Sequence, residues 1–493
     1  MKILVLTNFY PPHDFGGYEM SCRDVVERWL AAGHEVTVLT STTVVQGRWP
    51  QAGEEEGRVR RSLRLYWNDH RVQSPPLRGR LALELHNQRS LRRALRDMQP
   101  DVVSVWGMGG MSMGLLGTLA ERRVPAVLVI CDEWPVYGVE MDAWLRPLAR
   151  LAAARGTATG VATGVATGVA TGVATGVATG VATGVATGVA RGRRRVADAL
   201  WLAAAGAAHA LGCSPASLPP LDSVGPACFV SDALRHRVRE QSPWYFPDSS
   251  VVHSGVDLEV FRADPADRPP PAGKDAWGWR ALFAGRIDPR KGIDTVLRAF
   301  ALLDARATLQ VLGRGDPAHL AELVALAHEL GIEGRVSFGQ ASREDLASSY
   351  RQADVVLFAS TWEEPFGLVP VEAMACGTPV VATATGGAAE YLVDGRNCLV
   401  CPAGDAAGMA GLVHLLASDP AIREHIVAGG KATARELGVD KLADLLLAQH
   451  ETAASGAGTA GTADPGKSGS APAERQERHA PAERQERQPP PLP

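Results

Sequence analysis

Short apolar runs alternate with helical segments along this chain, and the alternation occurs in two separate sets. In the first set, an apolar run at residues 2–10 precedes a helix expected from about Ser21 to Ala32, and a second apolar run follows at 35–41. A strand, a helix and a strand in this order predict a βαβ unit of a doubly wound parallel sheet. Further strands of the same sheet are expected at residues 101–106, 126–131 and 227–232.

The second set indicates another sheet of the same kind. Two such sheets facing one another across a cleft predict an α/β fold with two Rossmann-like domains. We expect an N-terminal domain at 1–265, a Pro-rich linker at 266–276 and a second domain at 277–450. The strands of the second domain are expected at residues 280–286, 307–313, 335–339, 353–360, 378–383 and 397–401.

Two low-complexity segments are expected to lie outside this fold. The tetrapeptide VATG repeats through residues 156–190. Its regular glycines and β-branched residues oppose a stable helix, and it supplies no large side chain for a core. We interpret the repeat as a loop inserted into the first domain, with a glycine-zipper partner surface as the alternative. The composition of residues 453–493 predicts a disordered tail.

The charge balance limits the classes of partner. Fifty Lys and Arg residues stand against 54 Asp and Glu residues, so no overall positive field favours nucleic acid. No apolar run approaches the roughly 20 residues of a membrane span, and the opening residues do not suit a signal peptide. We therefore expect a cytoplasmic protein with free thiols. Cys398 and Cys401 have CxxC spacing but lack a second ligand pair, so we interpret them as core residues.

Two carboxylates flank the start of an expected helix in the second domain. Glu364 lies in a loop, and Glu372 lies on a helix that should open near Leu368 and stop at Gly377. The unpaired first-turn amides, at Leu368 and Val369, suit a diphosphate. Glu372 is then placed to accept the hydroxyls of a ribose, while Glu364 faces the group beyond the phosphates. This layout indicates a nucleotide-sugar site.

Two basic residues add to this candidate site. Arg286 and Lys291 follow a predicted strand and project from its carboxyl end, where open α/β sheets bind ligands. Two cations and a helix N-terminus can stabilise a departing nucleoside diphosphate. Because the chain also lacks a DxD motif, we expect no essential metal ion. The alternative for the two cations is a surface ion pair with Asp288 or Asp294.

A Gly-Gly pair follows the first strand of the chain. Gly16 and Gly17 are expected in a loop, where the missing Cβ atoms let backbone amides approach a phosphate or a sugar. A plain turn is the alternative interpretation.

These segments resemble the retaining family-4 glycosyltransferases of the GT-B fold. Glu364 and Glu372, followed by Gly386, Gly387 and Glu390, are similar to the signature of that family. The segments FGGYE, VHSGVD and FAGRIDPRKG occur in the family's order, so the resemblance covers about residues 1–150 and 225–445.

The resemblance implies a retaining hexosyltransferase with Glu364 as a catalytic residue and no cofactor. A nucleotide-diphosphate sugar would be the co-substrate, and the acceptor would be a carbohydrate, lipid-linked or small-molecule hydroxyl. The loop at Gly16 and Gly17 would close on the donor phosphates. In retaining members the β-phosphate of the leaving group is thought to take the acceptor proton on the same face.

The chain departs from the family pattern after the strand at 126–131. Many members carry a His-Asp pair there, whereas this chain has Cys131 and Asp132. Asp132 is the nearest candidate to orient the acceptor hydroxyl, and a turn cap is its alternative role. A GT-B-shaped binding protein that has lost catalysis is therefore an alternative function.

A serine hydrolase is the other alternative. Residues 110–114 match G-x-S-x-G around Ser112, which is the nucleophile elbow of α/β-hydrolases. The preceding strand does not run straight into this motif, so Ser112 is better interpreted as the cap of the helix that follows.

A basic segment marks the first domain. Residues 58–96 contain eleven arginines and two acidic residues. We expect this segment either to meet an anionic acceptor or the anionic inner face of a membrane, or to form a solvated basic surface.

Overall fold

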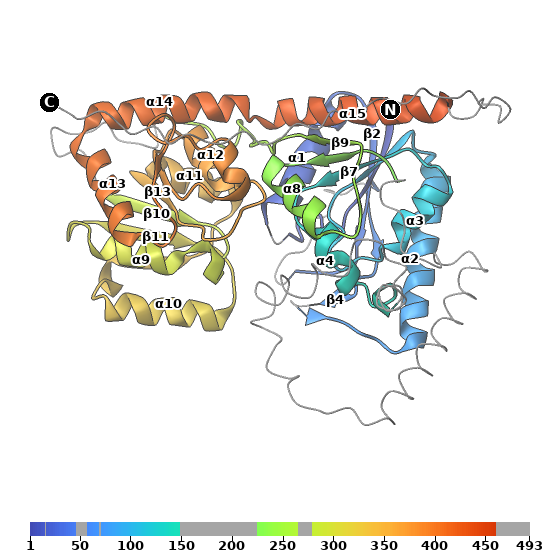
Figure 1. The fold of residues 1–493 in the computed structure, drawn as a ribbon, viewed down its shortest axis with the longest axis horizontal. Helices are drawn as coiled ribbons and strands as arrows, with labels where there is room; N and C mark the ends of the chain where they lie inside the picture. Colours follow the sequence, from blue (N-terminus) through green and yellow to red (C-terminus); the bar gives the residue numbers. More distant parts are fainter. Residues whose placement is uncertain (15, 46–56, 69–70, 148–223, 265–278, 460–493) are drawn as a thin grey trace, which may run out of the picture.

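The computed structural model describes residues 1–14, 16–45, 57–68, 71–147, 224–264 and 279–459. The VATG repeat, the linker at 266–276 and the residues beyond 459 lie outside the described residues. Two parallel sheets form, each with helices on both faces (Figure 1). The predicted fold class, an α/β protein with two Rossmann-like domains, is confirmed.

The first sheet has seven parallel strands in the order β3-β2-β1-β6-β7-β8-β9. Strands β3 and β9 escaped the sequence prediction because VRRSL and SSV contain no apolar run. A short β4–β5 hairpin stands apart from the sheet. The strands are β1 (Lys2–Leu6), β2 (Glu35–Ser41), β3 (Val59–Leu63), β4 (Trp67–Asn68), β5 (Arg71–Val72), β6 (Val102–Val105), β7 (Ala126–Ile130), β8 (Ala227–Phe229) and β9 (Ser249–Val251).

Helices cover both faces of this sheet. One apolar cluster joins α2, α3, α4 and α8 to one face, and another joins α1 and α15 to the other. Helix α1 begins four residues before the predicted start at Ser21, because the Glu19 carboxylate accepts the N–H of Gly16 at 3.0 Å and closes the first turn. The helices of this domain are α1 (Gly17–Ala31), α2 (Leu77–Met98), α3 (Gly114–Glu121), α4 (Trp134–Met141) and α8 (Asp232–Gln241).

The second sheet has six parallel strands in the order β12-β11-β10-β13-β14-β15. Every strand predicted for this domain is present. The strands are β10 (Arg280–Ala284), β11 (Thr308–Leu312), β12 (Val336–Gly339), β13 (Val355–Phe358), β14 (Val380–Ala382) and β15 (Leu399–Val400).

Two groups of helices sandwich the second sheet. Helices α9, α10 and α13 pack on one face, and α11 and α12 pack on the other. The helices are α9 (Ile293–Ala301), α10 (Pro317–Glu329), α11 (Arg343–Gln352), α12 (Leu368–Ala375), α13 (Ala406–Ser418) and α14 (Pro420–Glu436), with short 3-10 turns at Pro289–Lys291, Glu333–Arg335 and Gly386–Glu390. Cys398 and Cys401 are buried free thiols in this core, as predicted.

The last helix, α15 (Val439–Thr459), returns to the first domain. Figure 1 shows α14 and α15 running along one side of both domains. Trp29 of α1 donates from its indole N–H to the carbonyl of Ala443 at 3.0 Å. This packing differs from the predicted division, which placed residues up to 450 with the second domain. The helix also continues to Thr459, so the predicted start of a disordered tail at 453 is wrong; Ala453 and Ala454 pack against the apolar cluster of the first domain.

In the ranges that the structure describes, no helix is both long and apolar enough to cross a membrane.

Candidate functional site

The loop that carries Glu364 leads directly into α12, as predicted. Gly367 precedes the helix with a φ of 85°, a left-handed conformation that favours glycine. A Cβ atom on Gly386 would lie 2.5 Å from the carbonyl oxygen of Glu364, and the N–H of Gly387 donates to that oxygen at 2.7 Å. The two glycines of the family signature are therefore needed because the loop packs directly on their backbone.

Lys291 and Glu364 form a buried ion pair. The Lys291 Nζ atom lies 2.5 Å from Glu364 Oε1, and the two side chains are 16% and 5% exposed. Burial lowers the pKa of Lys291, while the Glu364 carboxylate counteracts this shift. The alternative of an ion pair with Asp288 or Asp294 is wrong for Lys291, because Asp288 instead accepts two hydrogen bonds from the Arg290 guanidinium.

Arg286 is the cation that remains available at this site. Its side chain is exposed, and it makes no hydrogen bond or ion pair with any residue of the described ranges. Its positive charge acts on Lys291 and also on Asp132 of the first domain. The guanidinium therefore lies at the carboxyl end of β10, within electrostatic range of both halves of the molecule.

Glu372 is held by a neighbour that the sequence did not indicate. The hydroxyl of Tyr350, on α11, donates to Glu372 Oε2 at 2.8 Å. Burial raises the pKa of Glu372, whereas the Tyr350 hydrogen bond and the charge of Arg343 lower it. One carboxylate oxygen is thus fixed by Tyr350, which orients the group near the start of α12.

The Gly-Gly segment of the first domain meets α12. A Cβ atom on Gly17 would lie 3.1 Å from Cδ1 of Leu368, so these two predicted diphosphate-binding residues are neighbours. Val369, the next residue of α12, is also partly exposed. Both glycines lie at the start of α1 rather than in the predicted loop. Because Glu19 already accepts the Gly16 amide, Gly17 is the stronger candidate for a ligand contact.

Asp132 follows β7 on the first-domain side. Its Oδ2 accepts the Tyr137 hydroxyl at 2.5 Å, and its Oδ1 accepts the backbone N–H of Trp134 at 3.2 Å. The alternative role as a turn cap is therefore present in the structure. Burial raises the pKa of Asp132 to about 6, and the bond from Tyr137 opposes that shift.

Further polar groups that sequence reasoning missed surround Asp132. Tyr18 donates to the side-chain oxygen of Asn8 at 3.1 Å, and Asn8 donates to the carbonyl of Gly109 at 2.9 Å. The charge of Asp132 acts on Tyr18 and Tyr137. No local sequence signal identifies this group, because its members follow different strands of the sheet.

The two domains also meet beside Glu364. Arg237 of α8 pairs with Glu133 at 2.6 Å and with Glu363 of the second domain at 2.9 Å. The Arg237 and Arg290 guanidinium groups lie 5.9 and 4.7 Å from the ring centroid of Trp362. The loop before Glu364 is thus held by side chains from both domains.

Two of the family segments meet at Glu390. His253, from VHSGVD, lies with its Nε2 2.9 Å from Glu390 Oε2. The other oxygen of Glu390 accepts the N–H of Ala233, in the first turn of α8, at 2.8 Å. Glu390 therefore acts as a brace between the domains.

The environment of Ser112 argues against a hydrolase function. Its side chain is fully buried, and its hydroxyl donates to the Glu84 carboxylate at 2.5 Å. A nucleophile must reach its substrate and be activated by a base such as histidine. The predicted role as a helix cap is also wrong, because α3 starts at Gly114 with no side-chain cap.

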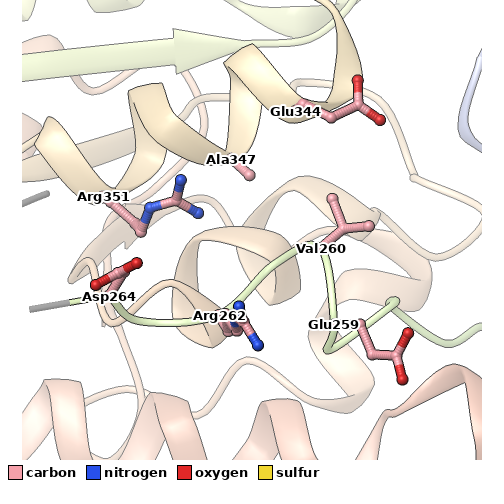
Figure 2. A pocket seen from close by; sticks show the side chains of 7 residues that line it. All are labelled: Glu259, Val260, Arg262, Asp264, Glu344, Ala347 and Arg351. Atoms are coloured by element: carbon pink, nitrogen blue, oxygen red, sulfur yellow. The ribbon is translucent and has the colours of Figure 1, made fainter. Parts of the chain in front are cut away.

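A separate pocket lies where the chain crosses between the domains (Figure 2). It has a volume of about 320 Å³, and none of the predicted site residues lines it. Its walls mix both signs of charge, which does not favour a diphosphate. The lining residues are Glu259, Val260, Arg262, Asp264, Glu344, Ala347 and Arg351.

Solved structures share this fold. Anabaena HepE in complex with UDP and glucose has a TM-score of 0.59 at 18% identity, covering 92% of this chain and 100% of that chain. A sucrose-phosphate synthase from Thermosynechococcus elongatus has a TM-score of 0.61 at 20% identity, covering 92% and 98%. At these identities the likeness concerns the fold.

Curated relatives are similar over part of the chain. The D-inositol 3-phosphate glycosyltransferase of Xylanimonas cellulosilytica is 36% identical over 44% of this chain and 56% of its own length. That of Mycolicibacterium vanbaalenii is 39% identical over 43% of this chain and 52% of its own length. The chain thus spans about half the length of the curated relatives it matches.

Each domain also matches a family model. Residues 16–171 match the glycosyl transferase 4-like domain, and residues 270–433 match glycosyl transferases group 1. These matches agree with the ordered motifs and with the two-domain fold. The chain thus resembles the family-4 glycosyltransferases of the GT-B fold in both of its domains.

Proposed function

We propose that this protein transfers a sugar from a nucleoside-diphosphate sugar to an acceptor hydroxyl, with retention of the anomeric configuration and without a metal ion. The observation that carries the proposal is the buried Lys291–Glu364 pair, whose carboxylate belongs to the loop that leads into α12 and whose lysine is within electrostatic range of Arg286. Cations and first-turn amides suit a diphosphate, and a carboxylate beside them suits sugar hydroxyls.

Each residue has a role in this proposal. Lys291, Arg286 and the amides of Leu368 and Val369 bind the diphosphate, with the start of α1 closing over it. Glu372 accepts the ribose hydroxyls through the carboxylate that Tyr350 orients. Glu364 accepts hydroxyls of the transferred sugar while Lys291 holds its charge in place.

The reaction follows from these contacts. The acceptor oxygen bonds to the anomeric carbon on the face from which the diphosphate departs, and the bond between that carbon and the phosphate oxygen breaks. The acceptor proton passes to the leaving β-phosphate, while Asp132 orients the acceptor hydroxyl. Lys291 and Arg286 stabilise the charge that develops on the diphosphate, so side-chain cations take the place of a metal ion.

The substrates can be tested with compounds suggested by the similar proteins. UDP-glucose is the first donor to use, because UDP and glucose occupy Anabaena HepE. D-inositol 3-phosphate is the first acceptor, because the similar curated proteins are named for it. Transfer in excess chelator, followed by proton NMR of the product linkage, would test metal independence and retention together.

The outcomes separate the alternatives. An α-linked product formed from UDP-glucose in chelator supports the proposal, and an inverted linkage contradicts it. Donor binding without hydrolysis or transfer across a panel of nucleotide sugars and acceptors would identify a binding protein that has lost catalysis. Ester hydrolysis abolished by Ser112→Ala would favour the hydrolase.

We also propose peripheral contact with an anionic membrane on the cytoplasmic side. What supports it is a row of exposed arginines on α2, at positions 78, 89, 93 and 96. Basic side chains near an anionic surface each contribute about 1 kcal/mol. Sedimentation with phosphatidylglycerol vesicles at low and high salt tests this; equal, negligible binding at both salt concentrations contradicts it.

A further inference from the structure

A buried ion pair joins the two domains close to Glu372. Arg343, the first residue of α11, donates from its two terminal nitrogens, Nη1 and Nη2, to the two carboxylate oxygens of Asp24 on α1, at 2.6 and 2.5 Å. The side chains are 14% and 3% exposed. Arg23 approaches the same carboxylate only at 3.7 Å. Arg343 is therefore the principal partner of a carboxylate that lies almost entirely out of water.

Packed side chains connect this pair to the predicted ribose site. The Arg343 guanidinium lies 5.5 Å from the ring centroid of Phe261, and that ring lies 6.0 Å from the ring of Tyr350. Tyr350 in turn donates to Glu372 at 2.8 Å. A continuous path thus runs from a helix of the first domain to the carboxylate of the second.

Electrostatics supports the same connection. Although burial lowers the pKa of Arg343, the charges of Asp24, Asp257 and Glu372 raise it. Asp257 is bound to Arg28 of α1 at 3.2 Å. The Arg343 guanidinium therefore interacts with three carboxylates: Asp24 of the first domain, Asp257 of the segment that crosses between the domains (residues 256–264, the crossing segment), and Glu372 of the predicted ribose site.

The crossing segment has one packed side and one open side. Phe261 is 2% exposed and faces Tyr350. Its neighbours Val260 and Arg262 line the pocket of about 320 Å³ beneath α11 (Figure 2). The segment therefore has free volume beside Val260 and Arg262, while Phe261 ties it to Tyr350.

We propose that Asp24 and Arg343 form an interdomain latch that holds the domains in the closed arrangement and keeps Glu372 oriented for the ribose. Both are positioning residues, since they act through Phe261 and Tyr350. The identity of the ribose ligand rests on the proposed function, whereas the latch between the domains does not.

The latch predicts coupling between domain closure and donor binding. Opening the domains separates Asp24 from Arg343, and donor binding favours the closed state in which Tyr350 holds Glu372. A ligand that favours one state gains apparent affinity when that state is more populated. Breaking the pair therefore weakens donor binding even though neither residue is assigned a donor contact.

The test compares Arg343→Gln and Asp24→Asn with the control Arg280→Gln. Arg280 binds Asp354, which is 1% exposed, but this pair lies within the second domain. We expect Arg343→Gln to raise the Kd of UDP about tenfold, equivalent to about 1.4 kcal/mol. Donor KM should rise more than kcat falls, Arg343→Lys should restore part of the affinity, and the control should match the wild type.

Hydrogen exchange provides a second measurement that needs no ligand. Peptides covering α11 and residues 256–264 should exchange faster in Arg343→Gln and Asp24→Asn than in the control. Unchanged exchange together with wild-type UDP affinity overturns the latch. If the wild type binds no nucleotide, the proposed function fails, and the exchange comparison alone decides the latch: faster exchange supports it and equal exchange overturns it.

Discussion

The two halves of the cleft handle charge in different ways. On the second-domain side, Lys291 pairs with Glu364, and Arg286 makes no hydrogen bond or ion pair with the residues that the structure describes. On the first-domain side, the carboxylate of Asp132 accepts hydrogen bonds from two neutral donors, the Tyr137 hydroxyl and the Trp134 N–H, and burial raises its pKa to about 6. Burial also raises the pKa of Glu372 on the second-domain side, so the two sides differ in the partners of their charged groups. The first arrangement suits a dianionic leaving group, and the second suits a neutral hydroxyl that must be oriented.

The halves also differ in how their residues are distributed along the chain. Glu364, Leu368 and Glu372 come from one loop and the helix after it. The polar group of the first domain instead combines Asn8, after β1, with Tyr18 and Asp132 from other segments. A local motif marks the candidate site in the second domain, whereas the polar group of the first domain is assembled by the sheet.

The largest effect is expected from Lys291→Ala. It removes the cation proposed to bind the diphosphate and leaves Glu364 buried without its ion-pair partner. We expect kcat/KM for sugar transfer to fall by about 10²–10³, the range for loss of one transition-state donor. The matched control is Arg306→Ala, whose side chain is 71% exposed. If kcat/KM falls less than twofold in Lys291→Ala, the proposed role of the Lys291–Glu364 pair in donor binding is contradicted.

A smaller effect on donor binding is expected from Glu372→Gln. The amide accepts hydroxyls more weakly than a carboxylate, so donor KM should rise about tenfold, or about 1.4 kcal/mol. Burial raises the pKa of Glu372, while Tyr350 and Arg343 lower it and Asp24 raises it. Because the ionised form binds, wild-type affinity should weaken as pH falls, and Glu372→Gln should lose this dependence. The exposed Glu322→Gln is the control.

On the acceptor side, Asp132→Asn separates orientation from capping. Asparagine also caps turns, so a structural role alone predicts wild-type activity. If the carboxylate orients the acceptor, kcat/KM should fall several-fold, short of the roughly 10² of a full general base. With the pKa of Asp132 raised to about 6, wild-type activity should rise as pH increases through about 6. A flat profile in Asp132→Asn would confirm the cause, and an identical profile in both proteins would contradict it.

The last prediction concerns stability in the first domain rather than activity. Burial raises the pKa of Glu84 to about 8, while the hydroxyls of Ser112 and Tyr66 donate to it. The folded state then keeps a proton that the unfolded state releases near pH 4.3, so stability should fall as pH rises toward 8. The slope contributed by this group is at most about 1.4 kcal/mol per pH unit. Urea unfolding of Glu84→Gln from pH 6 to 8 should show a shallower slope; an unchanged slope would contradict this reading.

Local patterns in the sequence predicted much of the fold. Apolar residues identified every strand of the second sheet: β10, β13 and β14 are almost fully buried, as expected of parallel strands covered on both faces, whereas the edge strand β12 alternates between partly buried and exposed residues. They missed β3 and β9, which contain polar residues and lie at the two edges of the first sheet. The helix after the Gly-Gly pair was placed too late because the closure of its first turn by Glu19 is a three-dimensional contact.

The two-domain α/β fold, the resemblance to the family and the motif around Glu364 and Glu372 could all be predicted from the order of the amino acids. These features depend on short-range periodicity, on helix starts and on glycine spacing, all of which are local along the chain. Long-range packing was needed to show that Lys291 pairs with Glu364, that Ser112 is buried against Glu84, and that α15 returns to the first domain. Asp24 and Arg343 lie 319 positions apart. Their pairing depends on how the two sheets dock, and no local pattern carries that information.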